Sequence, residues 1–125
     1  MKKNILLILL FIFTIQLSNT FCRNDHSEPN SLVEAAQECD YDECVSYIQN
    51  GSNVNETDNS GSTALHYAAL FGRPNIAQLL INNNANTTIQ NNAGYTALDL
   101  AQMNINPLNP NRHNTVISII NSTNN

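Results

Sequence analysis

Apolar residues recur with helical spacing in three parts of the chain, and the pattern restarts at a constant interval of 33 positions, from Leu32 to Leu65 and from Leu65 to Leu98. Apolar residues three or four apart, such as Leu65, Ala68 and Ala69, predict a short helix with one buried face. The equivalent residues in the other two parts are Leu32, Ala35, Ala36, Leu98 and Ala101. A second apolar run follows, with Cys44, Val45, Tyr47 and Ile48 in the first part and Ile76, Ala77, Leu79, Leu80 and Ile81 in the second. A pattern that restarts at such a period predicts an array of helix pairs.

Residues that begin and end helices follow the same period. Asn30, Thr63 and Thr96 are separated by this interval, and each can cap the first helix of its unit. In the middle unit, Gly72 can adopt the left-handed backbone that ends this helix, and Pro74 suits the first turn of the next helix. These signals predict helix-turn-helix units with defined boundaries.

The clearest copy of the repeat is Gly-Ser-Thr-Ala-Leu-His-Tyr-Ala-Ala-Leu-Phe-Gly at positions 61–72, and Gly-Tyr-Thr-Ala-Leu-Asp-Leu-Ala at 94–101 repeats its first half. The pattern Gly-x-Thr-Ala-Leu-His-x-Ala-Ala with this period resembles the ankyrin repeat, and the resemblance covers about residues 30–121. It implies an all-α solenoid of about three helix-turn-helix units joined by β-hairpin-like loops. The units would occupy about residues 30–60, 61–93 and 94–121.

The third unit departs from the period. Pro107 and Pro110 interrupt a continuous helix, and the apolar run from Val116 to Ile120 arrives about six residues late. We therefore expect a lengthened loop, then a closing second helix, and a disordered tail at 122–125.

Ankyrin-like arrays bind proteins through their loop tips and the concave side of their first helices, which implies a set of binding residues. At the tips these are Glu56, Thr57, Asp58, Asn59, Ile89, Gln90 and Asn91. On the concave side they are Gln37, Glu38, Leu70, Phe71, Met103 and Asn104. Leu70, Phe71 and Met103 would form an apolar patch flanked by acids, which is typical of an interaction surface. In the alternative, Leu70 and Phe71 are half-buried between units and hold the stack together.

The N-terminal segment has a charged start and an apolar run of about eleven residues, which is typical of a secretory signal peptide. We expect this signal at 1–20 and a linker at 21–29. Small residues at 18 and 20 favour cleavage before Phe21, and cleavage before Arg23 is the alternative. The protein would then be exported, periplasmic or secreted, with a bacterial source.

Membrane attachment remains an alternative, either through an uncleaved signal or through a lipid on Cys22. Lipoproteins need an aliphatic residue three positions before the cysteine and a small one directly before it. Asn19 and Phe21 occupy those positions here and depart from that pattern.

The charge of the chain is acidic. Its formal net charge is −5, and removal of Lys2 and Lys3 with the signal would make it −7. No basic stripe is present, which argues against nucleic acid or anionic lipid as a partner. The acids of the first half are Glu34, Glu38, Asp40, Asp42, Glu43, Glu56 and Asp58. We interpret them as a solvated face, with recognition of a basic partner as the alternative.

Candidate chemistry is sparse. His66 stands three residues after Thr63, so its ring can bond back to the turn and toward the next unit, and Asp99 stands in the same place after Thr96. His113 falls in the late loop with no partner at metal-ligand spacing, and His26 is equally isolated. No phosphate loop or nucleophile motif occurs. We expect a protein-binding module with no catalytic site, metal, cofactor or small-molecule substrate. The alternative is a structural accessory subunit that assembles with a larger partner or with itself.

Two cysteines lie at the turn between the two expected helices of the first unit. Cys39 corresponds to Gly72, so we expect a left-handed backbone there, which costs a residue with a β-carbon about 1 kcal/mol. Cys44 should point inward. In an exported protein the two could form a local disulfide, and a buried Cys44 thiol beside a surface Cys39 is the alternative.

Overall fold

The computed structural model describes residues 29–123, and these contain helices, turns and no strand. The helices are α2 (Leu32–Gln37), α3 (Tyr41–Gln49), α4 (Ala64–Leu70), α5 (Pro74–Asn82), α6 (Ala97–Met103) and α7 (Pro110–Thr123). The expected signal peptide, Cys22 and the linker up to residue 28 lie outside the described residues. Within those residues, no helix is both long and apolar enough to traverse a bilayer.

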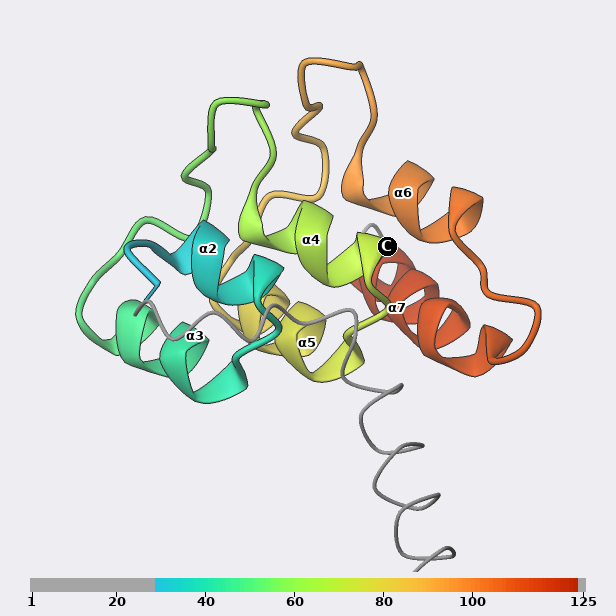
Figure 1. Cartoon of the computed structure of the whole chain (residues 1–125), viewed down its shortest axis with the longest axis horizontal. Coiled ribbons are helices and arrows are strands. Elements are labelled where there is room, and N and C mark those ends of the chain that lie inside the picture. The colour runs from blue at the N-terminus through green and yellow to red at the C-terminus, as the bar shows by residue number, and fades with distance from the viewer. Residues whose placement is uncertain (1–28, 124–125) are drawn as a thin grey trace, which may run out of the picture.

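The helices form two rows, with α2, α4 and α6 in one and α3, α5 and α7 in the other (Figure 1). Each helix of the first row packs against its partner in the second and against its neighbours in its own row. Small side chains such as Ala36, Ala69 and Ala101 are fully buried, which lets neighbouring helices approach closely. Leu65, Leu80 and other large side chains fill the space between the rows. The all-α array of three helix pairs expected from the repeat is confirmed.

The first helices begin at capping residues, with one correction to the expected register. Thr63 and Thr96 cap α4 and α6 as expected, whereas the cap of α2 is Ser31 and not Asn30. The Ser31 hydroxyl accepts the backbone N–H of Glu34 at 3.1 Å, and the Glu34 carboxylate accepts the backbone N–H of Asn30 at 2.8 Å. Because Ser31 and Glu34 satisfy these donors together, α2 begins one residue later than the period suggests.

As expected, α2 and α4 each end at a residue with a left-handed backbone conformation. Gly72 has φ of 58° and Cys39 has φ of 63°. After each, the chain bonds back to the helix, from the N–H of Arg73 to the carbonyl of Ala68 at 2.8 Å and from Asp40 to Ala35 at 2.9 Å. This pattern satisfies carbonyls that a helix end leaves without partners.

The third unit has the lengthened loop and closing helix that its prolines predicted, but three details differ. Pro110 opens α7 and does not belong to the loop, because proline is tolerated in the first helical turn. The helix continues through Thr123, so residues 122 and 123 are helical and not part of a tail, while 124 and 125 lie outside the described residues. His113 is a buried residue of α7 and not a loop residue. Its ring nitrogen Nε2 bonds the carbonyl of Leu70 at 3.1 Å and so closes the end of α4.

Candidate functional site

Two equivalent loops rise above the first row of helices (Figure 1). The first loop (51–62) joins α3 to α4, and the second loop (84–95) joins α5 to α6. Each is closed by a backbone bond across its tip, from Asp58 to Ser62 and from Asn91 to Tyr95, both at 3.0 Å. The loops are therefore hairpin-like, as expected, although the described residues contain no strand.

One side chain holds the tip of each loop in shape. The Asp58 carboxylate accepts the N–H groups of Ser60 at 2.8 Å and Ser62 at 3.0 Å, and it also accepts the hydroxyl of Tyr67 at 2.6 Å. Asn91, at the equivalent position of the second loop, accepts the N–H groups two and four positions ahead in the same way. Partial burial works to raise the pKa of Asp58, but the bonds from Ser60, Tyr67 and Ser62 outweigh it and lower that pKa. Asp58 is therefore a carboxylate at neutral pH.

The two loops are also bonded to each other. Asn92 donates its backbone N–H to the carbonyl of Ser60 at 2.9 Å and its side-chain amide to the carbonyl of Asn59 at 3.0 Å. A β-carbon at Gly61, where φ is 71°, would lie 2.6 Å from the amide oxygen of Asn92. A residue with a β-carbon at position 61 would be strained by this backbone and would displace the Asn92 side chain, so glycine favours the contact that joins the two loops into one edge.

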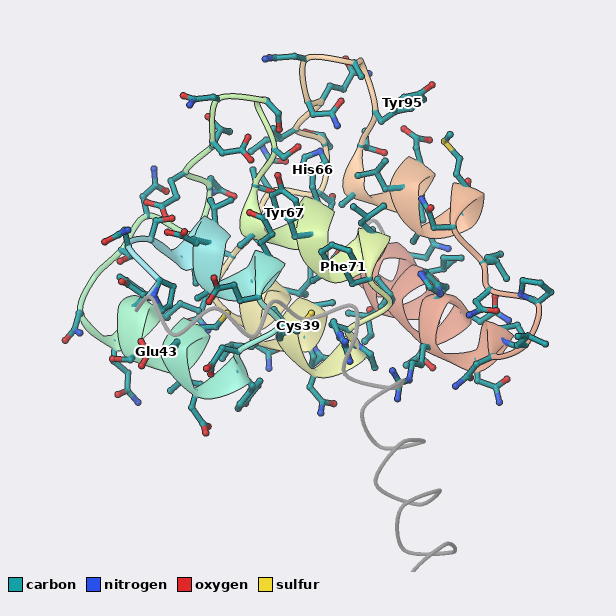
Figure 2. The ribbon with its side chains drawn as sticks, in the orientation of Figure 1. Cys39, Glu43, His66, Tyr67, Phe71 and Tyr95 are labelled. Carbon is teal, nitrogen blue, oxygen red and sulfur yellow. The ribbon has the colours of Figure 1, made fainter. Side chains whose placement is uncertain are left out.

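His66 links the start of α4 to the second loop, as its spacing from Thr63 predicted (Figure 2). Its Nδ1 accepts the backbone N–H of Thr63 at 3.1 Å, and its Nε2 bonds the carbonyl of Tyr95 at 3.0 Å. Only a neutral ring with its proton on Nε2 makes both bonds. Burial lowers the pKa of His66 despite opposing contributions from the Tyr95 carbonyl and Asp58, and this keeps the ring neutral. Asp99 makes the corresponding cap on Thr96.

Several residues expected at the loop tips have structural partners. Glu56 turns back and accepts the backbone N–H of Leu32 at 3.0 Å, so it supports the start of α2. Asp58 and Asn91 hold their own turns. The residues that project are Thr57, Asn59 and Gln90, which are exposed, while Ile89 is half-buried.

The residues expected on the concave helix side divide in a similar way. Leu70 and Phe71 are half-buried, and the ring of Phe71 stacks on Tyr67 with centroids 6.3 Å apart. Met103 and Asn104 are exposed at the end of α6, and Gln37 is exposed on α2. Of the three residues expected to form an apolar patch, Met103 is therefore exposed, whereas Leu70 and Phe71 are half-buried.

An open groove of about 320 Å³ lies between α2 and the first loop. Its lining residues are Ser31, Val33, Glu34, Gln37, Glu56, Thr57 and Asp58. Three of these are acidic, and none is a lysine or arginine. The sequence predicted Glu56, Thr57, Asp58 and Gln37 as binding residues, but it did not predict Ser31, Val33 or Glu34. The groove forms because α2 lies against a loop that is distant in the sequence, and the helical pattern of α2 gives no sign of that contact.

Among the described residues, Cys39 and Cys44 are thiols and are not joined by a disulfide in the structure. Cys44 is buried, and burial foremost, followed by the charge of Asp40, raises its pKa to about 12. Cys39 is half-buried at the corner. Among residues 29–123, no cluster of three or more histidine, cysteine or acidic side chains is arranged to hold a metal ion.

Comparison with known proteins identifies the architecture. The family model for ankyrin repeats in three copies matches residues 32–123. The chain belongs to the ankyrin-repeat family. Ankyrin repeats generally mediate interactions between proteins. The repeats of this chain form a hydrogen-bonded loop edge and an open groove.

This chain is similar to parts of three much longer proteins. It is 41% identical over 81 residues to the E3 ubiquitin-protein ligase hecd-1 of Caenorhabditis elegans, covering 64% of this chain and 3% of the ligase. It is 38% identical over 73 residues to the neurogenic locus notch homolog protein 1 of Danio rerio, covering 58% of this chain and 3% of that protein. It is also 38% identical over 55 residues to the alpha-latroinsectotoxin-Lt1a of Latrodectus tredecimguttatus, covering 44% and 4%. The chain thus spans only a few per cent of each relative.

Proposed function

We propose that the protein is an exported protein-binding module without catalytic activity, and that its partner contacts the loop tips and the adjacent concave side of the first helices. The observation that carries this proposal is the groove between α2 and the first loop. Its walls are held in place by Glu56 and Asp58, which bond backbone donors of α2 and of the loop itself. A groove with fixed walls binds with little loss of conformational entropy.

The charge of the groove specifies the kind of partner. Glu34, Glu56 and Asp58 line it, whereas the lining residue Val33 is buried. An extended segment that presents lysine or arginine is complementary to this surface, because opposite charges favour encounter and fix register. Binding should therefore weaken as salt is raised.

The test adds positive charge to the groove without removing a structural bond. Gln37 and Thr57 are exposed lining residues, and we expect Gln37→Arg and Thr57→Arg each to weaken binding of the partner captured from the native source by about tenfold or more. Ser46→Arg makes the same charge change at an exposed residue of α3 that does not line the groove, and this variant should bind the partner normally. Equal loss of binding in all three variants, or in none, would show that the groove is not the site.

Export rests on the charged start and apolar run of the N-terminal segment. Expression in the native host should give a shortened protein outside the cytoplasm, with Phe21 or Arg23 as its first residue. N-terminal sequencing decides the point, and an intact Met1 on cytoplasmic protein would contradict export. A lipid on Cys22 would appear as added mass on the N-terminal peptide.

A further inference from the structure

The third unit carries most of the large exposed apolar side chains among the described residues. These are Tyr95 at 40% exposure, Met103 at 62%, Ile105 at 39% and Leu108 at 93%. The helix α6 packs against α4 and α7, so its outer side and the loop that follows lie at the end of the array (Figure 1). Figure 2 shows Tyr95 projecting from the second loop toward this end. We call these four residues the terminal patch.

The backbone at the most exposed member of the terminal patch is ordered by a turn. Leu108 lies in a tight turn closed by a bond from the N–H of Asn109 to the carbonyl of Asn106 at 3.1 Å. The Asn106 side chain also accepts the N–H of Leu108 at 2.8 Å. Pro107 fixes the backbone within this turn, and Pro110 begins α7 directly after it. Leu108 is therefore presented to solvent by a pre-ordered turn, which reduces the entropy cost of burying it against another surface.

Charge is distributed very unevenly along the array. The first unit, residues 30–60, has seven acidic side chains and no lysine or arginine. The third unit, from residue 94 onward, has one acid, Asp99, and one base, Arg112. The apolar end is thus electrically neutral, whereas the opposite end is strongly acidic.

We propose that two copies of the chain associate through their terminal patches about a two-fold axis. Contact between two first units would bring fourteen acidic side chains together, seven from each copy, and so is opposed by repulsion. Head-to-tail contact would bury the terminal patch against carboxylates that must lose water. Of these three contacts, that between two terminal patches covers apolar surface on both sides without burying net charge, and a two-fold arrangement closes at the dimer.

The dimer contact goes beyond the proposed binding function and shares no residue with the groove, although Met103 was also expected on the concave helix side. The terminal patch lies in the third unit, and the groove lies in the first. A two-fold dimer would leave both grooves open at its far ends, so it would present two binding sites to a partner. Failure of either proposal leaves the other unaffected.

The experiment is sedimentation velocity of the chain as purified from its producing cells, over a hundredfold range of concentration. The expected result is a monomer that becomes a dimer and no larger species. Leu108→Ser and Met103→Gln should each weaken dimerisation by tenfold or more, with unchanged circular dichroism because both side chains are exposed. Tyr41→Ser is the matched control, since Tyr41 is 44% exposed on the acidic first unit, and this variant should dimerise normally.

Each other result overturns the proposal. A chain that stays monomeric throughout would leave the terminal patch to a different protein or to solvent. Growth beyond the dimer would indicate head-to-tail contacts. Association that Leu108→Ser and Met103→Gln do not weaken, or that Tyr41→Ser disrupts, would place the contact elsewhere.

Discussion

Replacement of His66 separates the two kinds of bond that hold the array together. The His66 ring caps α4 through Thr63 and reaches the next unit through the carbonyl of Tyr95. In His66→Asn, a shorter neutral side chain can still accept the N–H of Thr63 but cannot span to Tyr95. In His66→Ala, both bonds are lost. The comparison therefore distinguishes the local cap from the contact between units.

The expected magnitudes follow from the bonds and the burial. Loss of the bond to Tyr95 costs about 1 kcal/mol, and the space left by a buried ring costs about 1–2 kcal/mol more. His66→Asn should therefore lower the free energy of unfolding by about 2–3 kcal/mol. His66→Ala should lose about 1 kcal/mol in addition, because the cap is gone as well. These are large fractions of the roughly 5–15 kcal/mol that stabilises a domain.

Urea unfolding followed by circular dichroism measures both variants, with Asp99→Ala as the comparison that removes a cap but no contact with a following unit. Asp99→Ala should be the mildest of the three. If His66→Asn proves as stable as the wild type, the bond between units does not contribute to stability. If His66→Asn and His66→Ala are equally unstable, the cap contributes nothing.

The same histidine should make stability depend on pH. Its pKa is lowered in the folded protein from the ordinary value of 6.5, so the unfolded chain binds the proton more readily. The free energy of unfolding of the wild type should therefore fall as pH drops from about 8 to about 5.5, and His66→Asn should show a shallower fall. Parallel pH profiles for the two proteins would contradict a neutral, buried His66.

Three further predictions concern individual side chains. Tyr67→Phe removes one bond to Asp58 and should raise the pKa of that carboxyl, measured by NMR titration; an unchanged pKa would mean that the bond is not formed in solution. Cys39→Gly should stabilise the protein by about 0.5 kcal/mol in urea unfolding, because relief of left-handed strain exceeds the added freedom of the unfolded chain, and a loss of stability would refute the strain. A thiol reagent should modify Cys39 of the native protein and leave Cys44 unmodified until denaturant is added, as peptide mass mapping would show; absence of reaction at both sites after denaturation would reveal a disulfide.

Features that repeat could be predicted from the sequence, because equivalent residues of successive units have the same structural role. The caps at Thr63 and Thr96 and the left-handed residues at Cys39 and Gly72 are of this kind. The structural use of Asp58 and Asn91 also repeats, and their spacing could have identified them as residues that hold the turns.

Features that occur once were missed, because they depend on contacts between distant parts of the chain. His113 bonds the carbonyl of Leu70, far back in the sequence, and a loop longer than the period places it there. The bond between Glu56 and Leu32, which shapes the groove, likewise joins distant residues with no counterpart at the repeat period. The first cap lies at Ser31, where the Ser31 hydroxyl accepts the N–H of Glu34 and the Glu34 carboxylate accepts the N–H of Asn30, and the repeat period gives no sign of this pair of bonds.

Hydrogen exchange of the complex with the captured partner tests most directly whether the loop edge and groove bind protein. Backbone amides of α2, of the first loop around Thr57 and of the second loop around Gln90 should exchange more slowly in the complex than in the protein alone. Amides on the outer side of α3 and α5 should be unchanged. Slower exchange confined to α3 and α5, with the loops unaffected, would contradict the binding site described here.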